Sequence, residues 1–240
     1  MIEAPRGFVS IPLCEGGQLL LDQSLSATTL AHALREPWRH THPRPISLGT
    51  GRGPRGLLAL PDAPAVMVKQ CLRGGWLAPL NRQRYFGLSR FGRELVASRA
   101  AREAGLPVGE TVAVTFVPSR PGWRVWSASR WIADAEDLAH LWLQAPDAAT
   151  RAELWAAALT LLDAIAARGL EHPDLNLGNV LMRRDSQRGW SAILIDFDRA
   201  RWSGKPVSSS ARAGALARLE RSRDKLERRA ALSVGGSTVR

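Results

Sequence analysis

Three side chains in the second half of the sequence have the types and spacing that suit phosphoryl transfer. Asn179 comes five residues after Asp174, and Asp196 ends an apolar run farther along the chain. A carboxylate in the place of Asp174 can accept the proton of an attacking hydroxyl, while an amide and a second carboxylate provide oxygen ligands for Mg2+. The pattern therefore predicts ATP-dependent transfer of a phosphoryl group to a hydroxyl.

The chain between these residues is expected to form a hairpin that returns to the metal. Strands are predicted at 179–183 and 191–195, joined by a polar turn at 184–189. The hairpin would place Asp196 beside the ion that Asn179 contacts. A surface loop with scattered acids before an ordinary hairpin is the alternative, but the order, the spacing and the hairpin agree with the catalytic segment of protein kinases.

A glycine-rich segment at 48–56 precedes an apolar run and includes Gly49, Gly51 and Gly53. Its backbone N–H groups could lie over nucleotide phosphates. An ordinary hairpin turn explains the same residues equally well if the rest of the chain is ignored. We assign the three glycines to cofactor binding as a hypothesis.

Lysine is rare in this chain, which draws attention to Lys69. Of the 33 basic residues, only Lys69, Lys205 and Lys225 are lysine. Lys69 ends an apolar run, where a kinase places the lysine that contacts the α- and β-phosphates. We predict that Glu94, in a helix expected at 91–104, is its partner in cofactor binding. A solvated strand-end lysine and a solvated helix acid are the alternatives.

A set of segments around this pattern follows one family. They are 72–76, 81–86, 93–95, 105–108, 174–176 with Asn179, 195–201 and 216–222. In these segments the chain resembles the 3-deoxy-D-manno-octulosonic acid (Kdo) kinases and their lipopolysaccharide core heptose kinase relatives. The resemblance implies an α+β chain, a small two-lobed protein-kinase-like fold with a minimal C-lobe. It also implies phosphorylation of a Kdo or neighbouring sugar hydroxyl on the inner core of lipopolysaccharide, with ATP and Mg2+.

The predicted catalytic residues are Asp174, Asn179 and Asp196, and the predicted metal ligands are Asn179, Asp196 and Asp198. Asp198 belongs to an Asp-Phe-Asp sequence that replaces the protein-kinase Asp-Phe-Gly, as it does in the Kdo kinases. It either touches the metal or braces the loop. Pro173 stands where many protein kinases carry arginine, so regulation by a phosphorylated activation segment is not expected.

Periodicity predicts an N-lobe at 1–131, a C-lobe at 132–232 and a flexible tail at 233–240. Strands are expected near 56–60, 65–68, 111–117 and 123–127. Further helices are expected at 135–143, 150–168 and 211–232, the second carrying an apolar stripe that Gly169 ends. A chain of 240 residues with 45% hydrophobic content is long and apolar enough for a folded core.

The net charge of +11 is concentrated near the end of the chain. Residues 199–229 contain ten Lys or Arg and three Asp or Glu. Solvated arginine is one interpretation; a rim that attracts an anionic glycolipid substrate and its membrane leaflet is the other. Cys14 and Cys71 have no metal-type spacing, and neither a secretion leader nor an apolar run of membrane-spanning length is evident. We therefore expect a cytoplasmic protein. The lipid-anchored acceptor that the resemblance implies adds a peripheral position at the inner membrane, and we expect a monomer.

Three other functions could explain parts of the sequence. A heptose or aminoglycoside kinase would share the ATP chemistry and differ in its acceptor pocket. A basic nucleic-acid-binding module would explain the charge, but the sequence contains no motif for reading bases, so no nucleic-acid partner is expected. A pseudokinase is disfavoured because Lys69, Asp174, Asn179 and Asp196 are all present.

Overall fold

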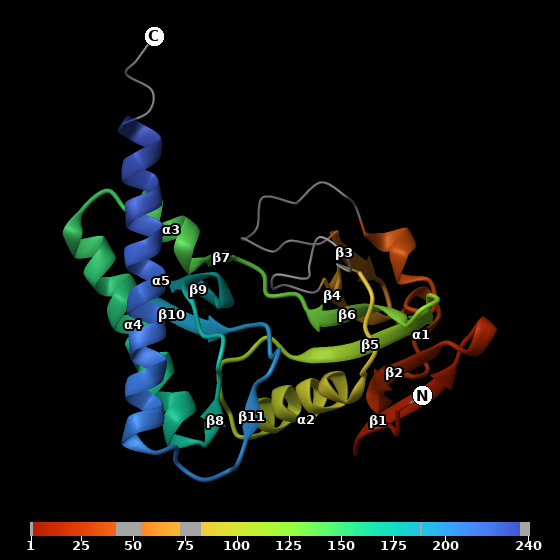
Figure 1. The fold of residues 1–240 in the computed structure, drawn as a ribbon. Coiled ribbons are helices and arrows are strands. Elements are labelled where there is room, and N and C mark those ends of the chain that lie inside the picture. The colour runs from red at the N-terminus through yellow and green to blue at the C-terminus, as the bar shows by residue number, and fades with distance from the viewer. Residues whose placement is uncertain (1, 42–53, 73–82, 188, 236–240) are drawn as a thin grey trace. The chain divides into compact units, whose positions relative to one another are not determined.

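The computed structural model describes residues 2–41, 54–72, 83–187 and 189–235 (Figure 1). These residues form two compact units. The first contains the described residues up to Arg99, together with Gly109–Ile132, and the second contains Ala100–Val108 and the described residues from Ala133 onward. Among the described residues, no helix combines the length and the apolar character needed to cross a membrane.

The first unit is built on an antiparallel sheet with the strand order β1-β2-β5-β6-β4-β3. Its strands are β1 (Phe8–Pro12), β2 (Gln18–Asp22), β3 (Arg55–Leu60), β4 (Ala63–Gln70), β5 (Thr111–Pro118) and β6 (Trp123–Arg130). The helices of this unit are α1 (Thr29–Ala33) and the start of α2 (Ser89–Glu103). The predicted strands are confirmed. The β1–β2 hairpin was not predicted, because β2 is buried along its whole length and lacks an alternating pattern.

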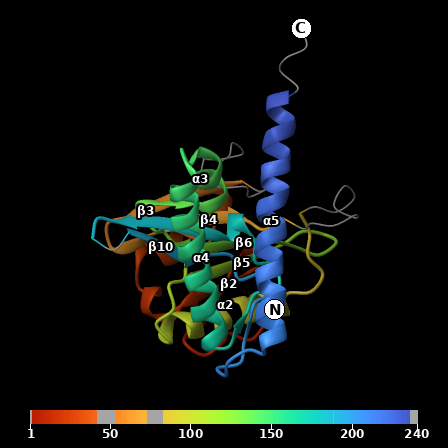
Figure 2. The same cartoon turned by 90° about the vertical axis from the view of Figure 1, so that its left-hand side faces the viewer.

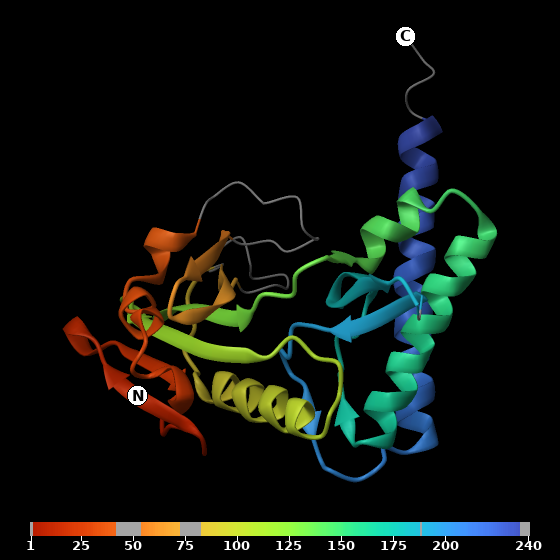
Figure 3. The same ribbon diagram turned by 180° about the vertical axis from the view of Figure 1, so that it is seen from behind.

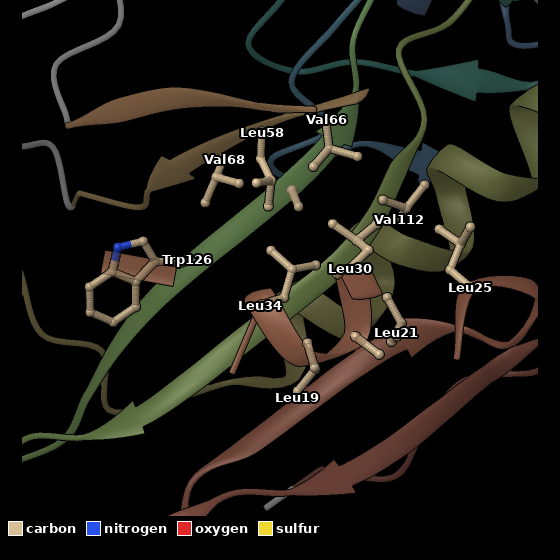
Figure 4. Packing of buried hydrophobic residues seen from close by; sticks show 13 residues of the cluster. Leu19, Leu21, Leu25, Leu30, Leu34, Leu58, Val66, Val68, Val112 and Trp126 are labelled. Atoms are coloured by element: carbon tan, nitrogen blue, oxygen red, sulfur yellow. The ribbon is translucent and has the colours of Figure 1, made fainter. Parts of the chain in front are cut away.

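Side chains on the two faces of this sheet form separate apolar clusters. Leu19 and Leu21 lie in one cluster and Leu20 in the other, as the two-residue period of a strand requires. Figure 4 shows the first cluster, where Leu30 and Leu34 pack with the strand residues. The second cluster holds α2 to the sheet through Phe91, Leu95, Val114, Phe116 and Val125, all fully buried.

The second unit combines small antiparallel sheets with three helices. Strands β7 (Ala135–Asp137), β9 (Val180–Asp185) and β10 (Gly189–Leu194) form one sheet, and β8 (Leu170–Glu171) pairs with β11 (Arg201–Trp202). The helices are α3 (Leu138–Gln144), α4 (Ala148–Ala167) and α5 (Ser209–Gly235). Helix α5 runs alongside α4, and its C-terminal turns extend past α3 and α4 (Figures 2 and 3).

Two element boundaries differ from the sequence prediction. The helix expected at 135–143 begins only at Leu138, because residues 135–137 pair with β9 and Asp137 caps the helix through the Ala139 N–H at 2.7 Å. The last helix continues to Gly235, so residues 233–235, assigned to the tail, are helical. Residues 236–240 lie outside the described part of the chain.

Helix α4 follows the prediction closely. Its predicted stripe of Leu154, Ala158, Leu161, Leu162 and Ile165 is buried. Gly169 lies directly after the helix with φ +82°, and a Cβ there would come 2.3 Å from the Lys205 carbonyl oxygen. Only glycine fits both the backbone angle and this close approach. The end of α4 therefore delivers the chain to the 172–179 loop.

Candidate active site

The 172–179 loop is held by hydrogen bonds to the backbone of Asp174. The side-chain amides of Asn176 and Asn179 both donate to the Asp174 carbonyl oxygen, at 2.7 and 2.8 Å. Asn176 also accepts from the Gly178 N–H at 3.0 Å and caps the short 3-10 helix Leu177–Asn179. These bonds fix the backbone of Asp174, and its side chain is exposed. An exposed carboxylate on a braced loop can act on a bound hydroxyl.

The hairpin after this loop brings the chain back to Asn179. Strands β9 and β10 pair from Val180 with Leu194 to Asp185 with Gly189. The Ile195 N–H then donates to the Asn179 carbonyl oxygen at 2.9 Å. Asp196 is the next residue, so the return predicted from the sequence is present in the backbone. The roles assigned to these side chains remain predictions.

Asp196 has an unusual backbone and a buried neighbour. Its φ of +64° lies in the left-handed region, which costs energy for a residue with a Cβ. The Nε2 atom of His172 lies 2.6 Å from the Asp196 carbonyl oxygen. His172 is 2% exposed, and its ring meets the fully buried Phe197 edge-on at 6.4 Å between ring centroids. The loop and the Asp-Phe-Asp segment are thus joined through one imidazole.

His172 is a site residue that the sequence analysis missed. Because a carbonyl oxygen only accepts hydrogen bonds, Nε2 must carry the proton, and Nδ1 is left buried without a partner among the described residues. Burial lowers the pKa of His172 below its ordinary value of 6.5, against smaller opposing effects of the contact with Asp196 and of nearby carboxylates. The sequence feature that could have identified His172 is its position two residues before Asp174.

The oxygen ligands of this unit fit a hard cation. The Asn179 side chain uses its nitrogen to bind Asp174, which leaves its Oδ1 atom as the ligand oxygen. The half-buried Asp196 and Asp198 add carboxylates. No group of three or more His, Cys, Asp or Glu side chains suited to a metal occurs among the residues that the structure describes. Oxygen atoms of amides and carboxylates are the ligand type that Mg2+ prefers, and Mg2+ usually takes one or two carboxylates together with water and phosphate oxygen.

Lys69 and Glu94, two of the residues predicted to bind the cofactor, lie in the first unit. Lys69 is on β4, opposite Arg55 on β3 and Ser127 on β6, and is half-buried. Glu94 is on α2, only 6% exposed, and accepts a hydrogen bond from the Thr111 hydroxyl at 3.4 Å. Its burial shows that it is not the solvated helix acid of the alternative interpretation. The pairing of Lys69 with Glu94 remains a prediction, and Gly49, Gly51 and Gly53 lie outside the described residues.

Two solved structures have a fold similar to that of this chain. The chain matches a structure described as WaaP in complex with acyl carrier protein, with a TM-score of 0.51, 19% identity, and coverage of 85% of this chain and 80% of that one. It matches the Rio2 kinase from Chaetomium thermophilum with a TM-score of 0.50, 20% identity, and coverage of 90% and 66%. At this identity the matches establish the fold, which is mixed α and β and kinase-like.

Curated relatives share more of the sequence. A 3-deoxy-D-manno-octulosonic acid kinase from Xanthomonas oryzae pv. oryzae is 33% identical over 161 residues, which cover 65% of this chain. A second, from Xanthomonas axonopodis pv. citri, is 29% identical over 196 residues, covering 77% of this chain and 75% of the relative. The match spans 60% of the length of the Xanthomonas oryzae protein.

A family model covers most of the chain and includes all the predicted site residues. It is the lipopolysaccharide kinase (Kdo/WaaP) family, matched over residues 49–233. The match contains the 172–179 loop, the hairpin and the Asp-Phe-Asp segment described above. The chain therefore belongs to the lipopolysaccharide kinase (Kdo/WaaP) family.

Proposed function

We propose that this protein transfers the γ-phosphoryl group of ATP to a hydroxyl of Kdo or a neighbouring sugar on the inner core of lipopolysaccharide. The observation that carries the proposal is the braced loop: Asn179 binds the Asp174 backbone, and the hairpin returns Ile195, the residue before Asp196, to the backbone of Asn179. Family membership and the Kdo kinase relatives support the class of acceptor.

In this proposal Asp174 accepts the proton of the attacking sugar hydroxyl, and its fixed backbone orients the carboxylate. Asn179 and Asp196 would hold Mg2+ through their side-chain oxygens. Asp198 either adds a ligand or braces the loop. When bound, Mg2+ would neutralise charge on the transferred phosphate. His172 positions Asp196 through its carbonyl oxygen.

Lys69 would provide positive charge for the nucleotide phosphates. We assign Lys69 to the α- and β-phosphates and Glu94 to holding that lysine in place. Gly49, Gly51 and Gly53 would cover the phosphates with backbone N–H groups. The compact ammonium of lysine suits this role better than a planar guanidinium.

The acceptor is lipid-anchored and anionic, so we propose that the protein works at the cytoplasmic face of the inner membrane. Three exposed basic residues of α5 share one helix face and form a basic stripe, defined as Arg221, Lys225 and Arg228. The exposed Leu232 follows on the same face. Arg223 does not belong to the stripe. It pairs with Asp224 at 3.0 Å and stacks over Trp155, 4.8 Å from the ring centroid.

Purified protein with ATP and Mg2+ should be offered a Kdo-bearing lipid A precursor, a core heptose acceptor and an aminoglycoside in parallel. Phosphate transfer to the Kdo-bearing acceptor is the expected result. Preferred transfer to the heptose or the aminoglycoside would retain the kinase chemistry and reject the acceptor. Absence of ATP turnover with all three would reject the proposed activity.

A further inference from the structure

Helix α5 presents two chemically different faces. The basic stripe is exposed, whereas Ala215 and Leu219 are buried and pack inside the second unit. Arg218 and Ser222 are half-buried, and their spacing of four residues puts them on one face of the helix. The proposed membrane contact accounts for the stripe and leaves Arg218 and Ser222 without a role.

Both of these residues hydrogen bond to the backbone of the 172–179 loop. Arg218 Nη2 donates to the His172 carbonyl oxygen at 3.4 Å, and the Leu177 N–H donates to Ser222 Oγ at 3.2 Å. His172 and Leu177 lie on either side of Asp174 in the chain. Two successive turns of α5 therefore hold the loop before and after the proposed base.

The arginine is built into the unit and does not project from it. Its Nε atom is buried and has no hydrogen-bond partner among the described residues, in contrast with the exposed Arg221 three positions along the helix. Burying part of a guanidinium costs free energy, which the bond to His172 partly offsets. Such an arrangement suits a positional role better than capture of a surface ligand.

We infer that Arg218 and Ser222 are positioning residues that keep Asp174 in its reactive place. The inference rests on the proposed function, because it assigns a purpose to the hold on the loop. Asp174 contributes only if its carboxylate meets the acceptor hydroxyl, and a displacement of about 1 Å can cost about a hundredfold in rate. Helix α5 would thus set the geometry of the site from a segment remote in sequence.

The test compares Arg218→Ala and Ser222→Ala with Arg151→Ala, which removes the same charge from an exposed position of α4 outside the basic stripe. Alanine is the best helix former, so Ser222→Ala does not weaken α5 through propensity. Each loop-facing change should lower kcat by about threefold to tenfold, the size expected for one hydrogen bond, with KM for ATP within about twofold. Ser222→Thr, which keeps the hydroxyl, should restore kcat.

Amide hydrogen exchange gives a readout that does not depend on turnover. In both loop-facing variants the Leu177 amide should exchange faster, while the amides of α4 keep the wild-type rate. In Arg151→Ala the Leu177 amide should exchange at the wild-type rate. If the wild type turns over no acceptor but the loop exchanges faster, the hold on the loop stands and the proposed activity fails. Unchanged kcat and exchange, or uniformly faster exchange across α4 and β9, would overturn the inference.

Discussion

His172 Nε2 lies 2.6 Å from the carbonyl oxygen of Asp196, joining the loop of the proposed base to the proposed metal ligand. Asp196 has a left-handed backbone with φ +64°, a conformation that persists only where neighbouring contacts enforce it. The buried imidazole is such a contact. Nδ1 of His172 is buried and has no hydrogen-bond partner in the part of the chain that the structure describes, which favours the neutral ring.

Stability should therefore depend on the protonation of His172. Burial lowers its pKa below the ordinary 6.5, so the unfolded chain takes up the proton first as pH falls. The contribution of His172 is complete above the unfolded pKa, declines below about pH 6.5, and is lost once the pH passes the folded pKa. Urea unfolding from pH 8 to pH 5 should show a smaller loss of stability for His172→Gln than for the wild type. An identical decline in both proteins would contradict the assignment.

The base can be tested by Asp174→Asn. This change keeps the backbone bonds from Asn176 and Asn179 but removes the proton acceptor. We expect kcat to fall by about a hundredfold or more, with ATP affinity and the thermal midpoint unchanged. Glu153→Gln, an equally exposed acid on α4, is the matched control. Near-normal turnover of Asp174→Asn would remove this residue from the role.

The metal assignment predicts a Mg2+-dependent defect in Asp196→Asn. Loss of one carboxylate weakens a site for a hard cation, so both MgATP affinity and turnover should fall. Nucleotide titrations with Mg2+ and with EDTA separate metal-dependent from metal-independent ATP binding. The metal-independent binding should change little in Asp196→Asn. If wild-type turnover were the same with and without divalent metal, the mechanism would be wrong.

The glycine after α4 can be tested against a second glycine with a similar backbone. Gly169 has φ +82° and a Cβ there would meet the Lys205 backbone, whereas Gly189 has φ +77° and nothing within 4 Å. A left-handed backbone costs about 1–2 kcal/mol for alanine at either position. Gly169→Ala should lower the free energy of unfolding by clearly more than Gly189→Ala in urea titrations. Equal losses would show that the close approach to Lys205 is relieved without cost.

Membrane binding should depend on the basic stripe. Changing Arg221, Lys225 and Arg228 to glutamine should weaken binding to anionic vesicles by up to about 3 kcal/mol at low salt, about 1 kcal/mol per charge. A control with Arg151, Arg183 and Arg201 changed to glutamine removes the same charge from exposed positions elsewhere in the second unit. Vesicle sedimentation at increasing salt measures both effects, because screening weakens a surface attraction. Equal losses in the two variants would assign the attraction to overall charge.

Local patterns were sufficient for much of the proposed catalytic segment. The spacing of Asp174 and Asn179, the hairpin that follows, and the apolar stripe of α4 could be predicted because each depends on residues close together in the chain. The same holds for Lys69 on a strand. Chemistry that is encoded in a short segment can be recognised without its tertiary surroundings.

Other features depend on contacts between distant segments. The strand at 135–137 exists because β9 pairs with it, and β2 exists because it pairs with β5. The bonds from Arg218 and Ser222 to the 172–179 loop span more than forty residues of sequence, at separations of 46 and 45. Periodicity shows which face of a helix is apolar, but not which backbone group a polar residue on that face will bind. That choice is made only when α5 packs against the loop, because a hydrogen bond requires the two groups to be brought within reach.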